Sequence, residues 1–194
     1  MASSKTGSVQ QDRMALLLTG HAIFHLPPAP AAAMLAATNV TTLTQETAMT
    51  TTRLNHAVNM TVTWVDTTAS LTGGTFTLVG RDQDNKPVSE VFVYTAAGAY
   101  IGVVAFSYLA SIICNLTGTF TGAGDETVAV ASATKFGLPV GQNGELVSVF
   151  KDLHAGTVGT VGVYNRTYGT VIPASAPNAD HTQEWFYTYK VRLL

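Results

Sequence analysis

Apolar and polar residues alternate with a period of two along much of the chain from about residue 61 to the C-terminus. In the segment TFTLV, Phe76 and Leu78 fall on one face of an extended strand, and Thr75 and Thr77 fall on the other. Short segments of this kind, rich in Val, Thr and aromatic residues, are separated by clusters of Gly, Asn, Asp or Pro. The pattern predicts a mainly β protein, either an antiparallel β-sandwich or a small barrel.

The segments that we expect to form strands share this composition and are short. They are MTVTWV (60–65), TFTLV (75–79), VSEVFVY (88–94), YIGVVAFSYL (100–109), GTFTG (118–122), ETVAVA (126–131), ELVSVF (145–150), GTVGTVGVY (156–164), GTVIP (169–173) and EWFYTYKVRLL (184–194). The long apolar run over residues 99–116 also fits a helix, because periodicity alone does not separate the two structures there.

Residues 1–60 have a different texture from residues 61–194, which we expect to form the β domain. The segment HLPPAPAAAMLAATN (25–39) contains three prolines, which favour extended backbone, and an alanine-rich stretch suited to a short helix. We expect an extended N-terminal arm with short helical pieces that lies on neighbouring subunits. The apolar residues expected at such intersubunit contacts, which would look the same in an ordinary core, are Leu16, Leu17, Leu18, Ile23, Phe24 and Leu26.

The chain has very few charges. Charged residues make up 11% of it, whereas about a quarter is usual for a soluble domain, and hydrophobic residues make up 46%. Few ionised groups oppose self-association in such a chain, so we expect it to be packed against partners. The formal net charge of -2 provides no basic surface, so we do not expect a nucleic-acid partner.

The sequence also argues against a membrane-inserted or exported chain. It has no uninterrupted apolar stretch of about 18 residues, which a transmembrane helix requires. Residues 14–24 follow Lys5 and Arg13 and resemble a signal peptide, but His21 and His25 interrupt the apolar region. We therefore expect neither a membrane anchor nor a cleaved signal.

Residues able to form a hydrolytic site are sparse. Ser148, Asp152 and His154 lie close together and would share one face of a strand, but no G-x-S-x-G motif accompanies them. Cys114 lies in an apolar run without a histidine nearby, which is typical of a buried, unreactive thiol. We expect these side chains to have no catalytic role.

Metal and cofactor sites are also poorly supported. His21 and His25 have the i, i+4 spacing of a helical metal site, but prolines follow at once and no acidic residue is near. Asp125 and Glu126 are adjacent, so on a strand they would point to opposite faces, and we expect them to charge a turn. No phosphate-binding loop is present. We expect no enzyme activity, no metal and no cofactor.

The segment TLVGRDQDNKPVSEVFVY (77–94) raises the question of a calcium site. Asp82 and Asp84 have the spacing of the first two oxygen ligands of an EF-hand loop. Lys86, Pro87 and Val93, however, occupy the positions that need an oxygen ligand, a glycine and a bidentate acid. We expect a β-hairpin with a charged, solvent-facing tip instead.

Three segments in order resemble tailed-bacteriophage virion structural proteins of the head-decoration or cement type: GGTFTLVGRDQDNKPVSEVFVYT, SIICNLTGTFTGAGDETVAVA and TKFGLPV. The later GTVGVYNRTYGTVIPASAPN is similar to the stretch that closes such proteins. The resemblance covers about residues 70–194, and Lys86 departs from it because glycine is common there. The residues that it implies to be structural turns are Asp82, Asp84, Asn85, Pro87, Gly122, Gly124, Asp125, Gly137 and Pro139.

The resemblance implies a protein made in the host cytoplasm that binds the capsid surface and stabilises the lattice of the major capsid protein. It also implies contacts with copies of itself, with a trimer favoured by analogy, and no catalytic residues. Two alternatives remain: a neck or tail subunit (tube, adaptor or fibre base), and a host-surface or carbohydrate-binding module. The second would use the aromatic cluster at 185–187, beside Asn178, Asp180 and Gln183.

Overall fold

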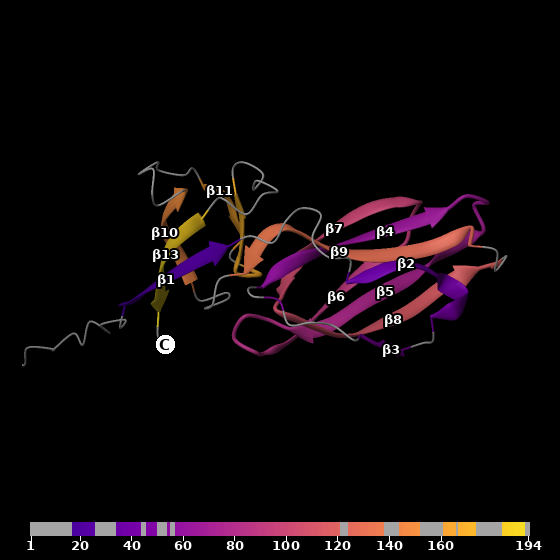
Figure 1. Cartoon of the computed structure of the whole chain (residues 1–194), viewed down its shortest axis with the longest axis horizontal. Coiled ribbons are helices and arrows are strands. Elements are labelled where there is room, and N and C mark those ends of the chain that lie inside the picture. Colours follow the sequence, from indigo (N-terminus) through magenta and orange to yellow (C-terminus); the bar gives the residue numbers. More distant parts are fainter. Residues whose placement is uncertain are drawn as a thin grey trace, which may run out of the picture.

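The protein is mainly β and forms a sandwich of two antiparallel sheets (Figure 1). The structure is a computed structural model that describes residues 17–25, 34–43, 46–49, 54, 57–120, 124–137, 144–151, 161–165, 167–173 and 184–192. Its strands are β1 (Leu17–His25), β2 (Leu35–Asn39), β3 (Glu46–Ala48), β4 (Val58–Asp66), β5 (Leu71–Arg81), β6 (Pro87–Val93), β7 (Gly98–Phe106), β8 (Tyr108–Gly118), β9 (Glu126–Gly137), β10 (Gly144–Lys151), β11 (Val161–Asn165), β12 (Thr170–Pro173) and β13 (Glu184–Arg192).

Two sheets build the sandwich, and a third sheet is separate. The six-stranded sheet has the order β11-β12-β9-β4-β7, with β2 also paired to β9. The four-stranded sheet has the order β3-β8-β5-β6. Strands β1, β13 and β10 form a three-stranded antiparallel sheet, drawn at the left of Figure 1. The prediction of a mainly β, sandwich-type fold is therefore confirmed.

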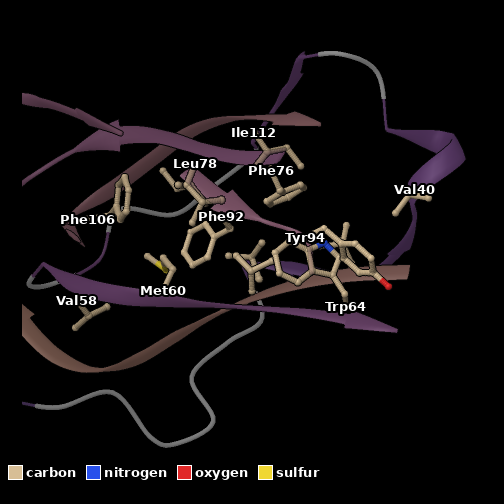
Figure 2. Packing of buried hydrophobic residues seen from close by; sticks show 14 of the residues in the cluster. Val40, Val58, Met60, Trp64, Phe76, Leu78, Phe92, Tyr94, Phe106 and Ile112 are labelled. Atoms are coloured by element: carbon tan, nitrogen blue, oxygen red, sulfur yellow. The ribbon is translucent and has the colours of Figure 1, made fainter. Parts of the chain in front are cut away.

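The core lies between the two larger sheets. Trp64, Phe76, Leu78 and Phe106 are almost completely buried, and Figure 2 shows that they extend from facing strands into one apolar layer. Trp64 packs edge-on against Phe76, Tyr94 and Tyr100, with ring centroids between 4.5 and 6.4 Å apart. Edge-to-face contacts of this kind add to the stabilisation from burial alone. The period-two pattern of apolar residues therefore identifies which side of β4 and of β5 faces the core.

The apolar run at 99–116 forms two strands and not a helix. β7 belongs to the six-stranded sheet and β8 to the four-stranded sheet, and only Ser107 separates them. The Ser107 N–H donates to the carbonyl oxygen of Arg81 at 2.7 Å, which fixes the bend between β7 and β8 beside the end of β5. Gly80 lies against this corner, where a side chain would collide with the backbone of Tyr108. One run of sequence thus passes from one sheet to the other.

The described parts of residues 1–60 pair with strands of the β domain. β2 lies beside β9, and β3 lies beside β8. The alanine-rich segment, where a helix was expected, contributes β2, and a 3-10 turn follows it at Val40–Thr42. Val40 is buried in the core. Backbone pairing with a neighbouring strand therefore overrides the helical preference of alanine.

Two further expectations from the sequence need correction. The segment GTFTG was expected to be a strand, but β8 ends at Gly118, and Thr119 and Phe120 lie beyond it. Glu126 was expected to charge a turn, but it is the first residue of β9 and is fully buried. Glu126 points to the same side of β9 as the buried Val128 and Val130, so its carboxyl group lies at the end of the core.

Candidate interaction faces and the groups that frame them

The outward side of the four-stranded sheet is a surface almost without charge. Phe76 and Leu78 of β5 are fully buried, so the residues between them point away from the core. The strand register extends this outward row to β6 and β8. We call this surface the β5 face, and its residues are Thr75, Thr77, Val79, Ser89, Val91, Val93, Ile113 and Asn115. Among the described residues, its ionisable neighbours lie at the rim: Glu46 on β3 and Arg81 at the end of β5.

The outward side of the six-stranded sheet has the same character. Val62 and Trp64 of β4 are buried, so Thr61, Thr63 and Val65 point outward. Their partners on β7 and β9 are also small or aliphatic. We call this surface the β4 face, and its residues are Thr61, Thr63, Val65, Ala99, Ile101, Thr127, Ala129 and Ala131. No ionisable side chain is among these eight.

The charged side chains of the described sandwich concentrate at the two ends of its strands. Others lie at the seam, where β6 of one sheet meets β7 of the other. One end is the β5–β6 hairpin, and the other is where β4 ends and β9 begins. The residues at the two ends are Asp82, Asp84 and Lys86, and Asp66, Asp125 and Glu126, respectively. The fold therefore separates the charges from the two broad faces.

The hairpin between β5 and β6 is present as predicted, and its tip is exposed. The Oδ1 atom of Asp82 accepts hydrogen bonds from the backbone N–H groups of Asp84 at 2.9 Å and Lys86 at 2.8 Å. Asn85 has a φ of 63°, a left-handed conformation that asparagine tolerates. Burial, and then the charge of Asp82, raise the pKa of Asp84. The Asp82 carboxylate is thus occupied in closing the turn.

Replacing Asp82 by alanine should reduce the free energy of unfolding by about 1 kcal/mol, because two backbone N–H groups lose their acceptor at an exposed turn. Asp82→Asn keeps a side-chain oxygen and should retain most of the stability. Urea unfolding followed by tryptophan fluorescence measures both variants. Equal losses for the two would contradict this role for the side-chain oxygen.

At the opposite end, Asp66 organises the connection from β4 to β5. Its carboxylate accepts hydrogen bonds from the Ser70 N–H at 2.9 Å, the Leu71 N–H at 3.1 Å and the Tyr94 hydroxyl at 2.8 Å. Burial opposes ionisation of Asp66, but these hydrogen bonds outweigh it, so its pKa lies below the ordinary value. The Ser70 hydroxyl also reaches the Oε1 atom of Glu126 at 2.5 Å. The acidic side chains at this end therefore hold the backbone of the connection.

Asn59 lies between two irregularities in the six-stranded sheet. The register of β4 with β7 shifts between Asn59 and Thr61, and its register with β9 shifts between Val58 and Met60. Asn59 is fully buried, and its Nδ2 donates to the carbonyl oxygen of Gly102 at 2.7 Å. Its Oδ1 accepts from the Lys135 N–H at 2.8 Å. One amide side chain thus joins the two bulged neighbours of β4.

Glu90 connects the two sheets at their common seam. It lies on β6, in phase with the buried Phe92, and its carboxylate accepts from the N–H groups of Val103 at 2.6 Å and Val104 at 3.4 Å on β7. Lys135 Nζ donates to the Gly102 carbonyl oxygen at 2.8 Å. Burial raises the pKa of Glu90, whereas the two N–H groups and the charge of Lys135 lower it by less. Sequence reasoning missed Glu90, although an acidic residue at an inward strand position was a usable signal.

The other residues predicted from the sequence lie apart from these groups. Among the expected intersubunit residues, Leu17, Leu18, Ile23 and Phe24 are in β1, paired with β13, whereas Leu16 and Leu26 lie outside the described residues. Among the turn residues, Pro87 begins β6, Gly124 has a φ of 88°, and Gly137 ends β9. Asp125 accepts a hydrogen bond from the Thr67 hydroxyl at 3.1 Å. Gly122 and Pro139 lie outside the described residues.

The residues considered for chemistry are not brought together where the structure describes them. Ser148 lies in β10, but Asp152 and His154 are outside the described residues. His21 and His25 lie in β1. Cys114 is only partly buried, whereas the sequence predicted a buried thiol, and burial raises the pKa of this thiol. Across the described ranges, no group of three or more His, Cys, Asp or Glu side chains is placed to hold a metal ion.

Comparisons with known proteins identify no family for this chain, so its function has to be inferred from the fold and the two faces. No family model, curated protein or solved structure matches the chain. In the described part of the chain, no helix has the length and apolar character needed to cross a membrane.

Proposed function

We propose that this protein is a structural subunit of a larger protein assembly and that it acts by binding, without catalysis. The observation that carries the proposal is the pair of uncharged faces, the β5 face and the β4 face, on opposite sides of the sandwich. Most soluble domains display many charges on such surfaces. A lone charge that is buried in an interface without a partner costs several kcal/mol, so faces without charges are suited to permanent contact.

More specifically, we propose a decoration or cement protein on the capsid of a tailed bacteriophage. The resemblance of residues 70–194 to such proteins supports this assignment, and its hairpin segment forms the β5–β6 hairpin. In this role the protein would be made in the host cytoplasm, bind the major capsid protein and contact copies of itself, with a trimer favoured by analogy. Two opposite faces would allow one subunit to contact two neighbours at once.

The location and copy number of this chain in purified particles test the proposal directly. A cement protein should be present in many copies over the capsid surface, and should bind to expanded capsids that lack it. Few copies at the neck or tail would support the alternative of a neck or tail subunit. Absence from the particle would contradict both assignments.

A lysine in the centre of either face should disrupt binding to the assembly. Thr63→Lys places a charge in the β4 face, and Thr77→Lys places one in the β5 face. If the altered face is buried against a partner, we expect affinity for expanded capsids to fall about 100-fold or more, because the ammonium group would lose its hydration in the interface.

The matched control for these variants is Ala97→Lys, which adds the same charge to an exposed position in the β6–β7 connection. It should leave binding unchanged. Circular dichroism and unfolding curves of all three variants separate loss of binding from loss of folding. Undiminished binding by both Thr63→Lys and Thr77→Lys would show that neither face is the interface.

A further inference from the structure

One side of the sandwich brings together the terminal strands of both sheets. β6 is the last strand of the four-stranded sheet, and β7 is the last strand of the six-stranded sheet. The hydrogen bonds from Glu90 to Val103 and Val104 join them. We call this side the β6–β7 edge. Its two strands carry strongly exposed aliphatic side chains that point to opposite faces: Val91 at 57% and Val93 at 56% on the β5 face, and Ile101 at 64% on the β4 face.

An edge of this kind invites the addition of another strand. Terminal strands present backbone N–H and C=O groups to solvent, and an exposed aliphatic edge strand is a common site of association between chains. Val91 and Val93 alternate with Glu90 and Phe92, so the exposed row of β6 has no charge of its own. A second copy of this chain would bring the same uncharged row, and the two rows would be compatible about a two-fold axis.

Glu90 binds backbone N–H groups of β7 that an added strand would otherwise use. Its carboxylate takes the N–H groups of Val103 and Val104, where β7 bulges away from the regular ladder with β4. Bulges and inward-pointing charged residues are the devices that keep sheet edges from pairing with other chains. We propose that Glu90 closes the β6–β7 edge against strand addition by a second copy of this chain, so that partners meet the protein through its faces.

The glycine at position 102 is part of this arrangement. A Cβ atom on Gly102 would collide with the carboxylate of Glu90 and approach the carbonyl oxygen of Met60. The Gly102 carbonyl oxygen also accepts hydrogen bonds from Asn59 and Lys135, which hold the bulge in place. The carboxylate can therefore approach β7 closely because position 102 lacks a side chain.

The test is the self-association of the purified full chain, measured by sedimentation velocity over a wide range of concentration. Glu90→Ala removes the cap from β7 and should raise the association constant about tenfold or more relative to the parent chain. Amide hydrogen exchange at Val103 and Val104 should become faster in the variant. The control Asp84→Ala changes the net charge by the same amount at the hairpin tip and should leave association unchanged.

A second variant separates an opened edge from general misfolding. Adding Ile101→Lys to Glu90→Ala places a charge on β7, the strand from which the cap is removed, and should return association to the level of Ile101→Lys alone. A folded Glu90→Ala chain that associates no more than the parent would overturn the proposal. Association that persists in the double variant would also overturn it. If Glu90→Ala does not fold, the same measurements on Glu90→Met, which keeps the length of the side chain but has no oxygen acceptor, decide the question. These measurements need only the purified chain, so they stand apart from the proposed function.

Discussion

Replacing Asn59 by leucine is expected to lower the free energy of unfolding by about 3 kcal/mol. The side chain is fully buried and hydrogen-bonds the backbone of both neighbouring strands, through the carbonyl oxygen of Gly102 and the N–H of Lys135. Leucine has a similar size but leaves these buried groups without that partner, and each such loss costs about 1–3 kcal/mol. Chemical unfolding in urea, followed by tryptophan fluorescence, measures the change.

Two further variants show whether the bulges cause the effect. Thr61→Val changes an outward residue on the same strand and should change stability by less than about 0.5 kcal/mol. Asn59→Asp keeps an oxygen for the Lys135 N–H but loses the donor to Gly102, so hydrogen exchange should accelerate on the β7 side more than on the β9 side. A loss below about 1 kcal/mol for Asn59→Leu would show that the bulges are stable without this bridge.

The second large effect is a loss of stability at alkaline pH that depends on Tyr94. Burial, together with the hydrogen bond to Asp66 and its negative charge, raises the pKa of Tyr94 to about 12. The ordinary value of about 10 applies in the unfolded chain. The folded state therefore holds this proton more tightly. The resulting stabilisation is complete below pH 10 and disappears as the pH rises through the folded pKa.

Tyr94→Phe provides the comparison. The variant loses the hydrogen bond to Asp66, so it should be about 1 kcal/mol less stable at neutral pH. Its stability should then change less steeply between pH 10 and 12 than that of the parent chain. Tyr168→Phe, which alters an exposed tyrosine, should leave the slope unchanged. Parallel curves for Tyr94→Phe and the parent chain would contradict the assignment of the alkaline loss to Tyr94.

The hairpin at residues 77–94 shows what local sequence specifies well. Asp and Asn at a tight turn bond their own backbone, and the strands on either side have the residue types typical of β structure. Because these interactions lie within a few residues, the turn and its exposed tip follow from the sequence. The same local chemistry explains why Asp82 serves the turn, since its oxygen accepts two backbone N–H groups of that turn.

The roles of Asn59, Glu90 and Glu126 were not predictable in the same way. Each depends on residues that are distant in sequence: Asn59 on Gly102 and Lys135, Glu90 on Val103 and Glu126 on Ser70. A shift in strand register changes which backbone groups lack a partner, and only the assembled sheets define those shifts. The path of residues 99–116 was ambiguous for a related reason, because a run that is buried in two sheets lacks a single clear period.

Residue order by itself determined the β class, the inward faces of β4 and β5, the β5–β6 hairpin and the scarcity of charge, because each depends on composition or on contacts between near neighbours. The tertiary structure decided which surfaces of the protein lack charged side chains. Strand pairing places Thr, Ala, Val and Ile residues from separate segments side by side in two uncharged faces. Acidic side chains lie instead at the ends of the sandwich and at the seam between β6 and β7. Such surfaces arise from the register between distant strands, which the alternation within one strand does not specify.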